Sequence, residues 1–450
     1  MSWNAPRRLA LLLVAVPAAC ARPVPVPPGT TAYALEGGRW FDGEGFASRT
    51  MYVLGDVLHE RSPERIDSTI DLSGRWIVPP YGDAHTHNLD GGFRLEEMRE
   101  AYRAEGTFYV QVLTNTTRGA AAVRDSFARR GTLDVRYANG GFTSTLGHPF
   151  LAYEPRAIGI FSQAALEARA AALCASRRQL GNAYWFVDDA SDLERVWSEW
   201  LRGGPDVLKI FLLHSERFQP DTSCALSHPE GPEAGADQRG LDPALVPAIV
   251  ERAHAAGIPV WAHVESAHDV AVAVRAGVDG LAHIPGYQLR PRDPTAPYEI
   301  DADVAALAGQ RGVAVTPTLI VGDTFAGPDS TGARRQLRRR TLERLREAGA
   351  RIVVGSDAYG RTAGPEVEAL RALGLWDNLA LLRMWAVTTP QVIFPDRRIG
   401  RLADGYEASL LALECDPLTA WDCTARISLT IKDGLLLAIE PRDRSSSGRP

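Results

Sequence analysis

Two histidines separated by one residue are the first side chains in this sequence whose spacing suggests chemistry. His85 and His87 stand in the segment DAHTH, directly after the apolar run RWIVPP. In an extended strand, residues i and i+2 point to the same face, so both imidazoles can approach one metal ion. Alone, such a pair is weak evidence, because two partly buried histidines that bond to their neighbours give the same pattern.

Three more residues of metal-ligand type lie at the predicted ends of other strands. His263 ends the run PVWAHV, His283 ends GLAHI, and Asp357 follows RIVVGS. Parallel strands of an α/β barrel deliver their last side chains to one mouth, where the active sites of such barrels lie. Imidazole and carboxylate groups that converge there indicate a metal centre.

Lysine is almost absent from this chain. Lysine and arginine together number 49, but lysine occurs only at Lys209 and Lys432. Lys209 lies inside the apolar run VLKIFLL, which predicts a buried strand. A neutral primary amine can add CO₂ to form a carbamate, whereas a guanidinium stays protonated and cannot. Lys209 is therefore a candidate carbamate ligand, and an ordinary salt-bridging lysine is the alternative.

The elements that must position these residues fall into three parts. Short strand-like runs with Gly-rich turns occupy residues 32–79, strands alternate with helices over 80–399, and strands return over 400–441, before a disordered tail at 442–450. Repeated βα units predict an α/β fold, a (β/α)8 TIM barrel. The two strand-rich ends predict one small β-sandwich domain built from both ends of the chain.

The N-terminus has the features of an export signal. Arg7 and Arg8 precede an apolar run and small residues, which predicts a signal peptide over residues 1–19. Cys20 follows directly and is the expected lipidation site, at the start of a Pro-rich linker over 20–31. We expect an exported lipoprotein, periplasmic or anchored in the outer membrane, that contacts the membrane through the lipid on Cys20. Plain secretion and a chance match to such a signal are the alternatives.

The remaining cysteines are even in number, which suits disulfide bonds in an oxidising compartment. Cys415 and Cys423 are close enough in sequence to staple a C-terminal loop, and Cys174 could pair with Cys224 to join two barrel loops. Four unpaired cysteines are the alternative. A net charge of -6 gives no overall attraction for nucleic acid, so no such partner is expected.

Taken in order, the motifs resemble those of the amidohydrolase superfamily, in its branch of imidazolonepropionase-like enzymes and prolidase-like dipeptidases. They are DAHTH, Lys209 in VLKIF, His263 in AHVES, His283 in LAHIPG and Asp357 in GSDA. The likeness extends over residues 33–440 and includes the flanking phrases GRWIVPPYGDAHTH and IGRLADGYEASLLAL. Each motif alone is unspecific, but the five in this order are specific.

This resemblance implies a binuclear metal centre. Its ligands would be His85, His87 and Asp357 for one divalent ion, His263 and His283 for the second, and carbamylated Lys209 as a bridge shared with a hydroxide. Zinc suits these ligands, and manganese, cobalt and iron are the alternatives. The hydroxide would attack the scissile carbonyl, and Asp357 would pass its proton to the leaving nitrogen.

The residues that contact the substrate are less well indicated. His148, after the third strand, and His214 and Arg217, just beyond the Lys209 strand, are candidates, and each could instead belong to an ordinary loop. The expected function is cleavage of an amide bond in a small molecule, a dipeptide or an N-acyl amino acid. The alternatives are a lactone or cyclic-amide hydrolase or a deaminase with the same metal pair and, last, a non-catalytic binding lipoprotein.

Overall fold

The computed structural model describes residues 23–220 and 239–437. The predicted signal peptide at 1–19, the lipidation site Cys20 and the predicted tail at 442–450 lie outside the described residues. Within the described part of the chain, no helix is both long enough and apolar enough to cross a membrane.

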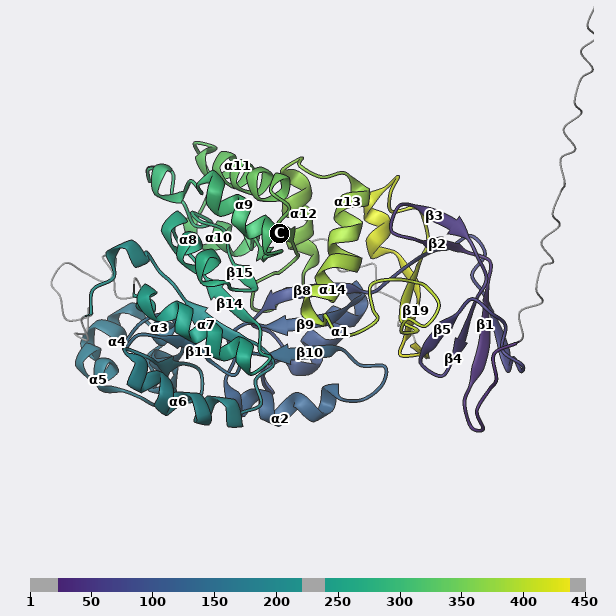
Figure 1. The fold of residues 1–450 in the computed structure, drawn as a ribbon, viewed down its shortest axis with the longest axis horizontal. Coiled ribbons are helices and arrows are strands. Elements are labelled where there is room, and N and C mark those ends of the chain that lie inside the picture. Colours follow the sequence, from purple (N-terminus) through teal and green to yellow (C-terminus); the bar gives the residue numbers. More distant parts are fainter. Residues whose placement is uncertain (1–22, 221–238, 438–450) are drawn as a thin grey trace, which may run out of the picture.

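Strands from both ends of the chain share one six-stranded sheet, on the right of Figure 1. Its order is β20-β19-β18-β7-β2-β3. The strands are β2 (Arg39–Phe41), β3 (Phe46–Ser48), β7 (Trp76–Val78), β18 (Leu410–Leu413), β19 (Ile427–Lys432) and β20 (Leu435–Leu437). The N-terminal β7 pairs directly with the C-terminal β18.

A second sheet, in the order β5-β4-β1-β6, packs against the first. Its strands are β1 (Ala32–Glu36), β4 (Met51–Leu54), β5 (Val57–His59) and β6 (Ser68–Asp71). Apolar side chains from the two sheets form one core, which includes Leu35, Trp40, Val53 and Leu410. Burial alternates along β4, as expected for a strand with only one face toward a core.

Parallel strands form the centre of the larger part of the molecule, in two sheets ordered β10-β9-β8 and β12-β11-β13-β14-β15-β16-β17. The strands are β8 (Tyr81–Thr86), β9 (Thr107–Val112), β10 (Asp134–Tyr137), β11 (Gly141–Thr143), β12 (Trp185–Phe186), β13 (Leu208–Phe211), β14 (Val260–His263), β15 (Gly280–Ala282), β16 (Ala314–Thr316) and β17 (Arg351–Ile352). Strands β13 and β14 are buried throughout, which explains their nearly continuous apolar sequences.

Backbone hydrogen bonds join these two parallel sheets at both sides. The Ala84 N–H donates to the Val354 carbonyl at 2.8 Å, and the Asp206 N–H donates to the Tyr137 carbonyl at 2.8 Å. Parallel strands covered by helices form the TIM-barrel-like domain that the sequence predicts, with the β domain beside it (Figure 1).

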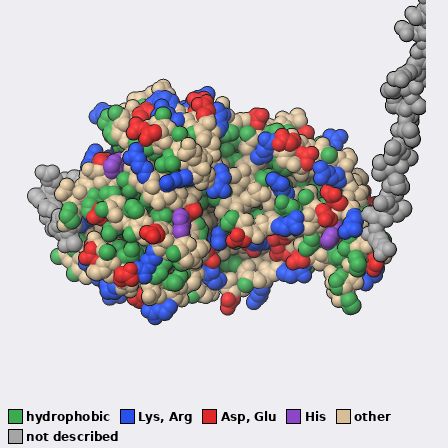
Figure 2. All heavy atoms as spheres, in the orientation of Figure 1, with side chains coloured by type: hydrophobic (Ala, Val, Ile, Leu, Met, Phe, Trp, Pro, Cys, Tyr) green, Lys and Arg blue, Asp and Glu red, His purple; other side chains and the backbone are tan. Residues whose placement is uncertain are grey.

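Helices follow most of the parallel strands and cover them (Figure 1). Helix α6 is typical: Asp189 caps its N-terminus, and one apolar face, including Trp197 and Trp200, is buried. The helices are α1 (Leu95–Glu105), α2 (Thr117–Phe127), α3 (Phe150–Ala157), α4 (Gln163–Ala168), α5 (Ala170–Ala175), α6 (Ala190–Arg202), α7 (Val246–Ala255), α8 (Ala267–Ala276), α9 (Ala302–Gln310), α10 (Leu319–Ala326), α11 (Ala333–Glu347), α12 (Gly364–Ala372), α13 (Asn378–Arg383) and α14 (Thr389–Ile393). On the face drawn in Figure 2, acidic and basic side chains are interspersed over both domains.

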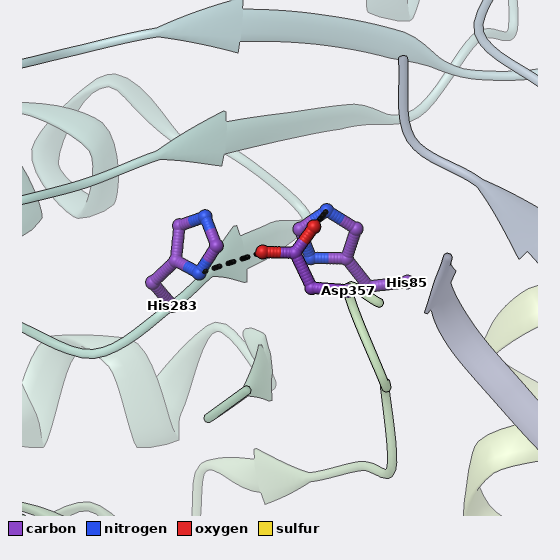
Figure 3. Close-up of side chains that lie close together, drawn as sticks. All are labelled: His85, His283 and Asp357. Carbon is purple, nitrogen blue, oxygen red and sulfur yellow. Dashed lines mark ion pairs between the residues drawn. The ribbon is translucent and has the colours of Figure 1, made fainter. Parts of the chain in front are cut away.

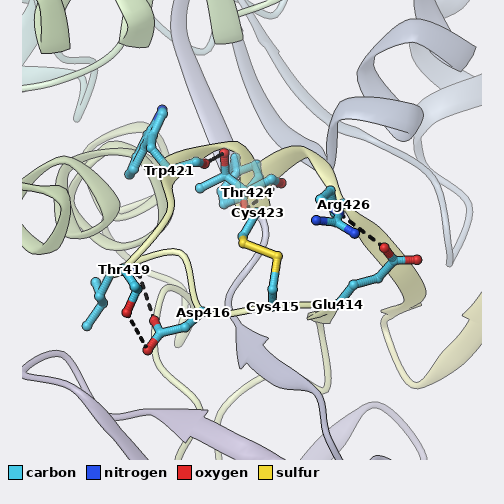
Figure 4. The surroundings of a disulfide bond; sticks show 10 residues. Glu414, Cys415, Asp416, Thr419, Trp421, Cys423, Thr424 and Arg426 are labelled. Atoms are coloured by element: carbon cyan, nitrogen blue, oxygen red, sulfur yellow. Dashed lines mark hydrogen bonds and ion pairs between the residues drawn. A yellow bond between two sulfur atoms is a disulfide. The ribbon is translucent and has the colours of Figure 1, made fainter.

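One expected disulfide bond staples a loop of the β domain (Figure 4). Cys415 and Cys423 are bonded, with their Cα atoms 5.4 Å apart. Within the same loop, Asp416 accepts a hydrogen bond from the Leu418 N–H at 2.9 Å. Cys174 is also disulfide-bonded, and its predicted partner Cys224 lies outside the described residues.

A buried ionic cluster joins the β domain to the parallel sheets. Lys432, at the end of β19, is fully buried, and its Nζ lies 3.0 Å from carboxylate oxygens of Asp134 on β10 and of Glu407. It also contacts the neighbouring Asp433, while Arg397 pairs with Asp134 at 3.0 Å and with Glu407. Because each charge has an opposite partner, the cluster offsets the desolvation cost of burial.

Replacing Lys432 by methionine should destabilise the fold strongly. The variant keeps the volume of the side chain, but it leaves Asp134 and Glu407 with Arg397 alone and removes the cation that contacts Asp433. Removing one partner of a buried ion pair typically costs about 3–5 kcal/mol. Urea denaturation followed by circular dichroism measures the change. Arg275→Ala is the control, because Arg275 forms an exposed ion pair with Asp303 and its loss should cost far less. Equal stability of both variants would contradict a joining role for the cluster.

Candidate active site

Histidines and an aspartate from four parallel strands meet at the carboxyl ends of those strands. His85 lies on β8, His263 ends β14, His283 directly follows β15, and Asp357 lies beyond β17. His85, His283 and Asp357 each place one ligand atom within 4.8 Å of the others (Figure 3). Three of the four strand ends therefore deliver their ligand-type side chains to one point.

Asp357 is the centre of this group. Its Oδ1 lies 2.7 Å from His87 Nε2 and 3.2 Å from His85 Nε2, and its Oδ2 lies 3.7 Å from His283 Nδ1. The rings of His263 and His283 are 4.5 Å apart, centroid to centroid. Each of the four histidines and the aspartate predicted to bind metal thus contacts at least one other member of this set.

Hydrogen bonds to the protein orient the imidazoles. His87 Nδ1 is 3.1 Å from the Thr114 carbonyl, and since a carbonyl only accepts, Nδ1 carries a hydrogen and Nε2 is the nitrogen that would bind a metal. His263 Nε2 faces Glu265 Oε1 at 3.0 Å, and His283 Nδ1 faces Thr318 Oγ1 at 2.6 Å. Such outer-shell partners fix the orientation of metal-ligating rings.

The backbone turns sharply where these side chains enter the cavity. His283 has φ 81°, Asp357 has φ 48° and Thr318 has φ 52°, all in the left-handed region that residues with a Cβ rarely occupy. His214 is a fourth example, with φ 47°. Strained backbone of this kind concentrates at functional sites, where the surrounding structure holds it in place.

Lys209 lies on β13 and is almost completely buried, with 1% of its surface exposed. Its Nζ has no hydrogen-bond partner among the described residues, and neither does Nδ1 of buried His85. Burial lowers the pKa of Lys209 to about 7, although the negative charge of Asp357 opposes the shift. A neutral amine is therefore accessible near neutral pH, as addition of CO₂ requires. Two orphaned buried nitrogens beside a carboxylate fit a metal centre.

Burial and mutual contact shift the pKa values of the other groups as well. Burial would raise the pKa of Asp357, but the charges of His85 and His87 hold it well below its usual value. Burial lowers the pKa values of His85, His263 and His283, which favours the neutral imidazoles that bind metals. His87 differs, because burial lowers its pKa but the hydrogen bond to Asp357 and the charge of that carboxylate outweigh burial and raise it.

A cavity of about 680 Å³ opens over these residues. His148 and His214, both predicted to contact substrate, line it, and the ring of His148 is 4.9 Å from that of His263. Arg217 does not line the described cavity: its side chain is 66% exposed and its Nε lies 3.8 Å from Glu216. The cavity wall also contains side chains not expected from the sequence: Thr114, Tyr153, Glu265, Tyr287, Gln288, Arg290, Ile320, Val321, Thr324, Phe325, Tyr359 and Arg361.

Glu265 and Tyr287 are the most consequential of these unexpected residues. Glu265 stands two positions after His263 in AHVES, so the same i, i+2 relation that singles out His85 and His87 would have found it. Tyr287 stacks on His283, with ring centroids 4.1 Å apart and planes 8° from parallel. No local sequence pattern predicts the position of Tyr287, because this residue lies in the loop after β15, where side-chain directions do not follow the alternation of a strand.

Comparison with known proteins identifies the family. The family model described as "Amidohydrolase family" matches residues 228–437. An uncharacterized protein of Mycobacterium tuberculosis is 31% identical over 397 residues, which cover 83% of this chain and 89% of that protein. The chain belongs to the amidohydrolase family. It is therefore a hydrolase acting on C–N bonds, as the sequence predicts.

The chain is also similar to a second sequence relative and to a solved structure. An imidazolonepropionase of Pseudomonas putida is 35% identical over 65 residues, 14% of this chain and 16% of that protein. A solved prolidase in complex with N-methylphosphonate-L-proline is 20% identical, with a TM-score of 0.66, over 91% of this chain and 100% of that one. At this identity the second likeness supports the fold, a TIM-barrel-like domain with an additional domain.

Lys209→Ala should reduce the metal content of the protein. Loss of an outer-shell partner weakens metal affinity about 10–100-fold, and loss of a bridging ligand should weaken it more. Mass spectrometry of the elements, after loading with zinc and bicarbonate, measures ions per chain. Lys209→Arg is the matched control, because it keeps a basic group that cannot form a carbamate, and it should lose metal equally. An arginine variant that retains the wild-type metal content would contradict the bridging role.

Proposed function

We propose that this chain is an exported hydrolase with two metal ions that cleaves the amide bond of a dipeptide or an N-acyl amino acid. The observation that carries the proposal is the buried, unpartnered Nζ of Lys209 beside histidines and Asp357 at the strand ends. Burial of polar nitrogens without partners costs free energy. Divalent ions, with a carbamate on the lysine, would remove that cost.

The residues that would hold the ions are those that converge at the strand ends: His85, His87 and Asp357 for one ion, His263 and His283 for the second, and carbamylated Lys209 between the two. Zinc fits imidazole and carboxylate ligands. When bound, such a pair of ions acidifies a water molecule and polarises the scissile carbonyl.

Asp357 has the position and the charge to move the proton. It is ionised, for the reasons given above, and it lies at the centre of the ligand group. It would take a proton from the attacking water and deliver it to the leaving nitrogen. His148 lines the cavity beside His263 and would donate a hydrogen bond to the substrate carbonyl oxygen. The walls of the cavity would orient the substrate and exclude bulk water.

The cavity supports a small substrate over a polymer. Its volume of about 680 Å³ lies in the range of sites that enclose small molecules, and a dipeptide fits within it. The solved prolidase that this chain is similar to carries an analogue of proline, which agrees with a dipeptide as substrate. The second candidate is a lactone or cyclic-amide hydrolase, or a deaminase, with the same residues, and the short likeness to imidazolonepropionase favours it.

We also propose that the parallel strands close into a (β/α)8 barrel and that the protein is exported. The hydrogen bonds that join the two parallel sheets at both sides support closure. The bonded pair of Cys415 and Cys423, and the disulfide of Cys174, support an oxidising compartment. A lipid on Cys20 would anchor the protein to a membrane.

Release of free amino acid from a panel of dipeptides and N-acyl amino acids tests this function. The full mature chain, loaded with zinc and bicarbonate, should hydrolyse a coherent subset of the panel. A chelator should abolish the activity and added zinc should restore it, because the attacking water depends on the ions. His85→Asn, which removes one ligand, should lose metal and activity together. Protein that carries two ions per chain but cleaves no member of the panel would contradict amide hydrolysis and favour the second candidate.

A further inference from the structure

Glu265 is a carboxylate in the cavity, and the proposed reaction uses only one of its two oxygens, the one that orients His263. It lies two residues beyond the end of β14, where the strand delivers His263. Of the described residues that line the cavity, only Glu265 and Asp357 carry carboxylates. Asp357 has a proposed role among the metal ligands, so the second oxygen of Glu265 is the acidic atom of this cavity that remains to be explained.

One oxygen of Glu265 is held firmly by the protein. Its Oε1 lies 3.0 Å from His263 Nε2 and accepts a hydrogen bond from the Tyr287 hydroxyl at 3.3 Å. Tyr287 in turn stacks on His283 at 4.1 Å between ring centroids. Glu265 is thus linked to both imidazoles predicted to hold the second ion, directly to His263 and through Tyr287 to His283.

The other oxygen of Glu265 is open to the cavity that this side chain lines. No described residue donates a hydrogen bond to Oε2, and the amine of Lys209 is not paired with it either. The side chain is 17% exposed, and Oε2 is not one of the fully buried atoms of the described residues, so a ligand in the cavity can reach it. A carboxylate oxygen in this position can accept a hydrogen bond from such a ligand, and a cationic donor gives the strongest one.

The chemistry of the proposed substrates supplies such a donor in one case only. A dipeptide with a free amino end carries an ammonium group, which has three N–H donors and no acceptor. In a peptide the amino nitrogen is about 2.5 Å from the carbonyl carbon of the same residue, from the standard bond lengths and angle. A group that binds this ammonium must therefore lie beside the metal centre that attacks the carbonyl, and Glu265 lies beside His263. An N-acyl amino acid places a neutral acyl group there instead.

We infer that Glu265 binds the free amino group of the substrate through Oε2, so that the enzyme acts on unblocked dipeptides in preference to N-acyl amino acids. This inference rests on the proposed function and narrows its substrate class. Glu265 then discriminates a free amino group from an acylated one through Oε2. Its other oxygen, Oε1, keeps the contacts with His263 and Tyr287 that hold both side chains in place.

Binding of a hydrolysis-resistant ligand pair tests the inference independently of turnover. The ligands are a ketomethylene analogue of leucyl-leucine with a free amino group and the same analogue with that group acetylated. Calorimetry at pH 7.5 measures their affinity for the zinc-loaded full chain. The wild type should bind the amino form about tenfold or more tightly than the acetylated form, as expected when a charge-assisted hydrogen bond is lost.

Glu265→Gln keeps the shape of the side chain and removes its charge. In this variant the affinity for the amino form should fall to that for the acetylated form. The amide oxygen of glutamine can still accept a hydrogen bond from His263 Nε2, so this ring keeps its orientation, and with excess zinc the metal content should stay as in the wild type. Glu347→Gln is the matched control, because Glu347 is 67% exposed at the end of α11, outside the residues that line the cavity, and it should bind both ligands as the wild type does.

Four results would overturn the inference: equal affinity of the wild type for both ligands, no binding of the amino form, a preference that survives in Glu265→Gln, or loss of an ion from that variant, which would make Glu265 a metal ligand. Parallel assays of hydrolysis separate the two proposals. A wild type that binds the amino form through Glu265 but cleaves no dipeptide would support the amino-binding role of Glu265 and contradict the proposed hydrolysis of amides.

Discussion

The unpartnered amine of Lys209 is the constraint on which the rest of the site depends. A charged ammonium inside a strand of a parallel sheet needs a hydrogen-bond acceptor, and Nζ has none among the described residues. Burial lowers its pKa to about 7, so the fold makes a neutral amine accessible near neutral pH. Burial also favours the neutral forms of His263 and His283, while Asp357 is ionised. Cations and a carbamate would satisfy all of these groups at once, whereas no side chain of the described chain does.

Lys432 shows why the rarity of lysine is not sufficient evidence by itself. Both lysines of this arginine-rich chain are buried, but Lys432 lies between Asp134, Glu407 and Asp433 and needs no further chemistry. The compact ammonium fits a site where a longer guanidinium would not. Rarity therefore predicts burial at both positions. Only the absence of an acid partner distinguishes Lys209 as a reactive amine.

Much of the fold and of the metal site could be predicted because their signals are local. Apolar runs that end in histidine or aspartate place a side chain at a strand end, and the barrel rule then brings the strand ends together. The remaining residues are positioned by loops, whose paths depend on contacts far along the chain. Arg217 is an example: it follows the Lys209 strand, as a mouth residue should, but the short turn after His214 directs its side chain toward solvent. Tyr287 is the converse, a loop residue that returns to stack on a metal-ligand candidate.

The position of His283 depends on such distant contacts. Its Nδ1 is bonded to Thr318, the residue before α10, and both oxygens of buried Glu366 on α12 accept the first N–H groups of that helix, at 2.8 and 3.0 Å. Arg338 on α11 donates to the carbonyl of Tyr287 at 2.6 Å and to that of Leu319 at 3.1 Å. Arg338 therefore links the two segments that contact the imidazole, the one that contains Tyr287 and the one that begins α10. Because α10 also contributes Ile320, Val321 and Phe325 to the cavity wall, the same contacts position both this candidate metal ligand and part of the cavity wall. If this segment moved to fit different substrates, it would also move the His283 imidazole, so these contacts favour a cavity of fixed shape.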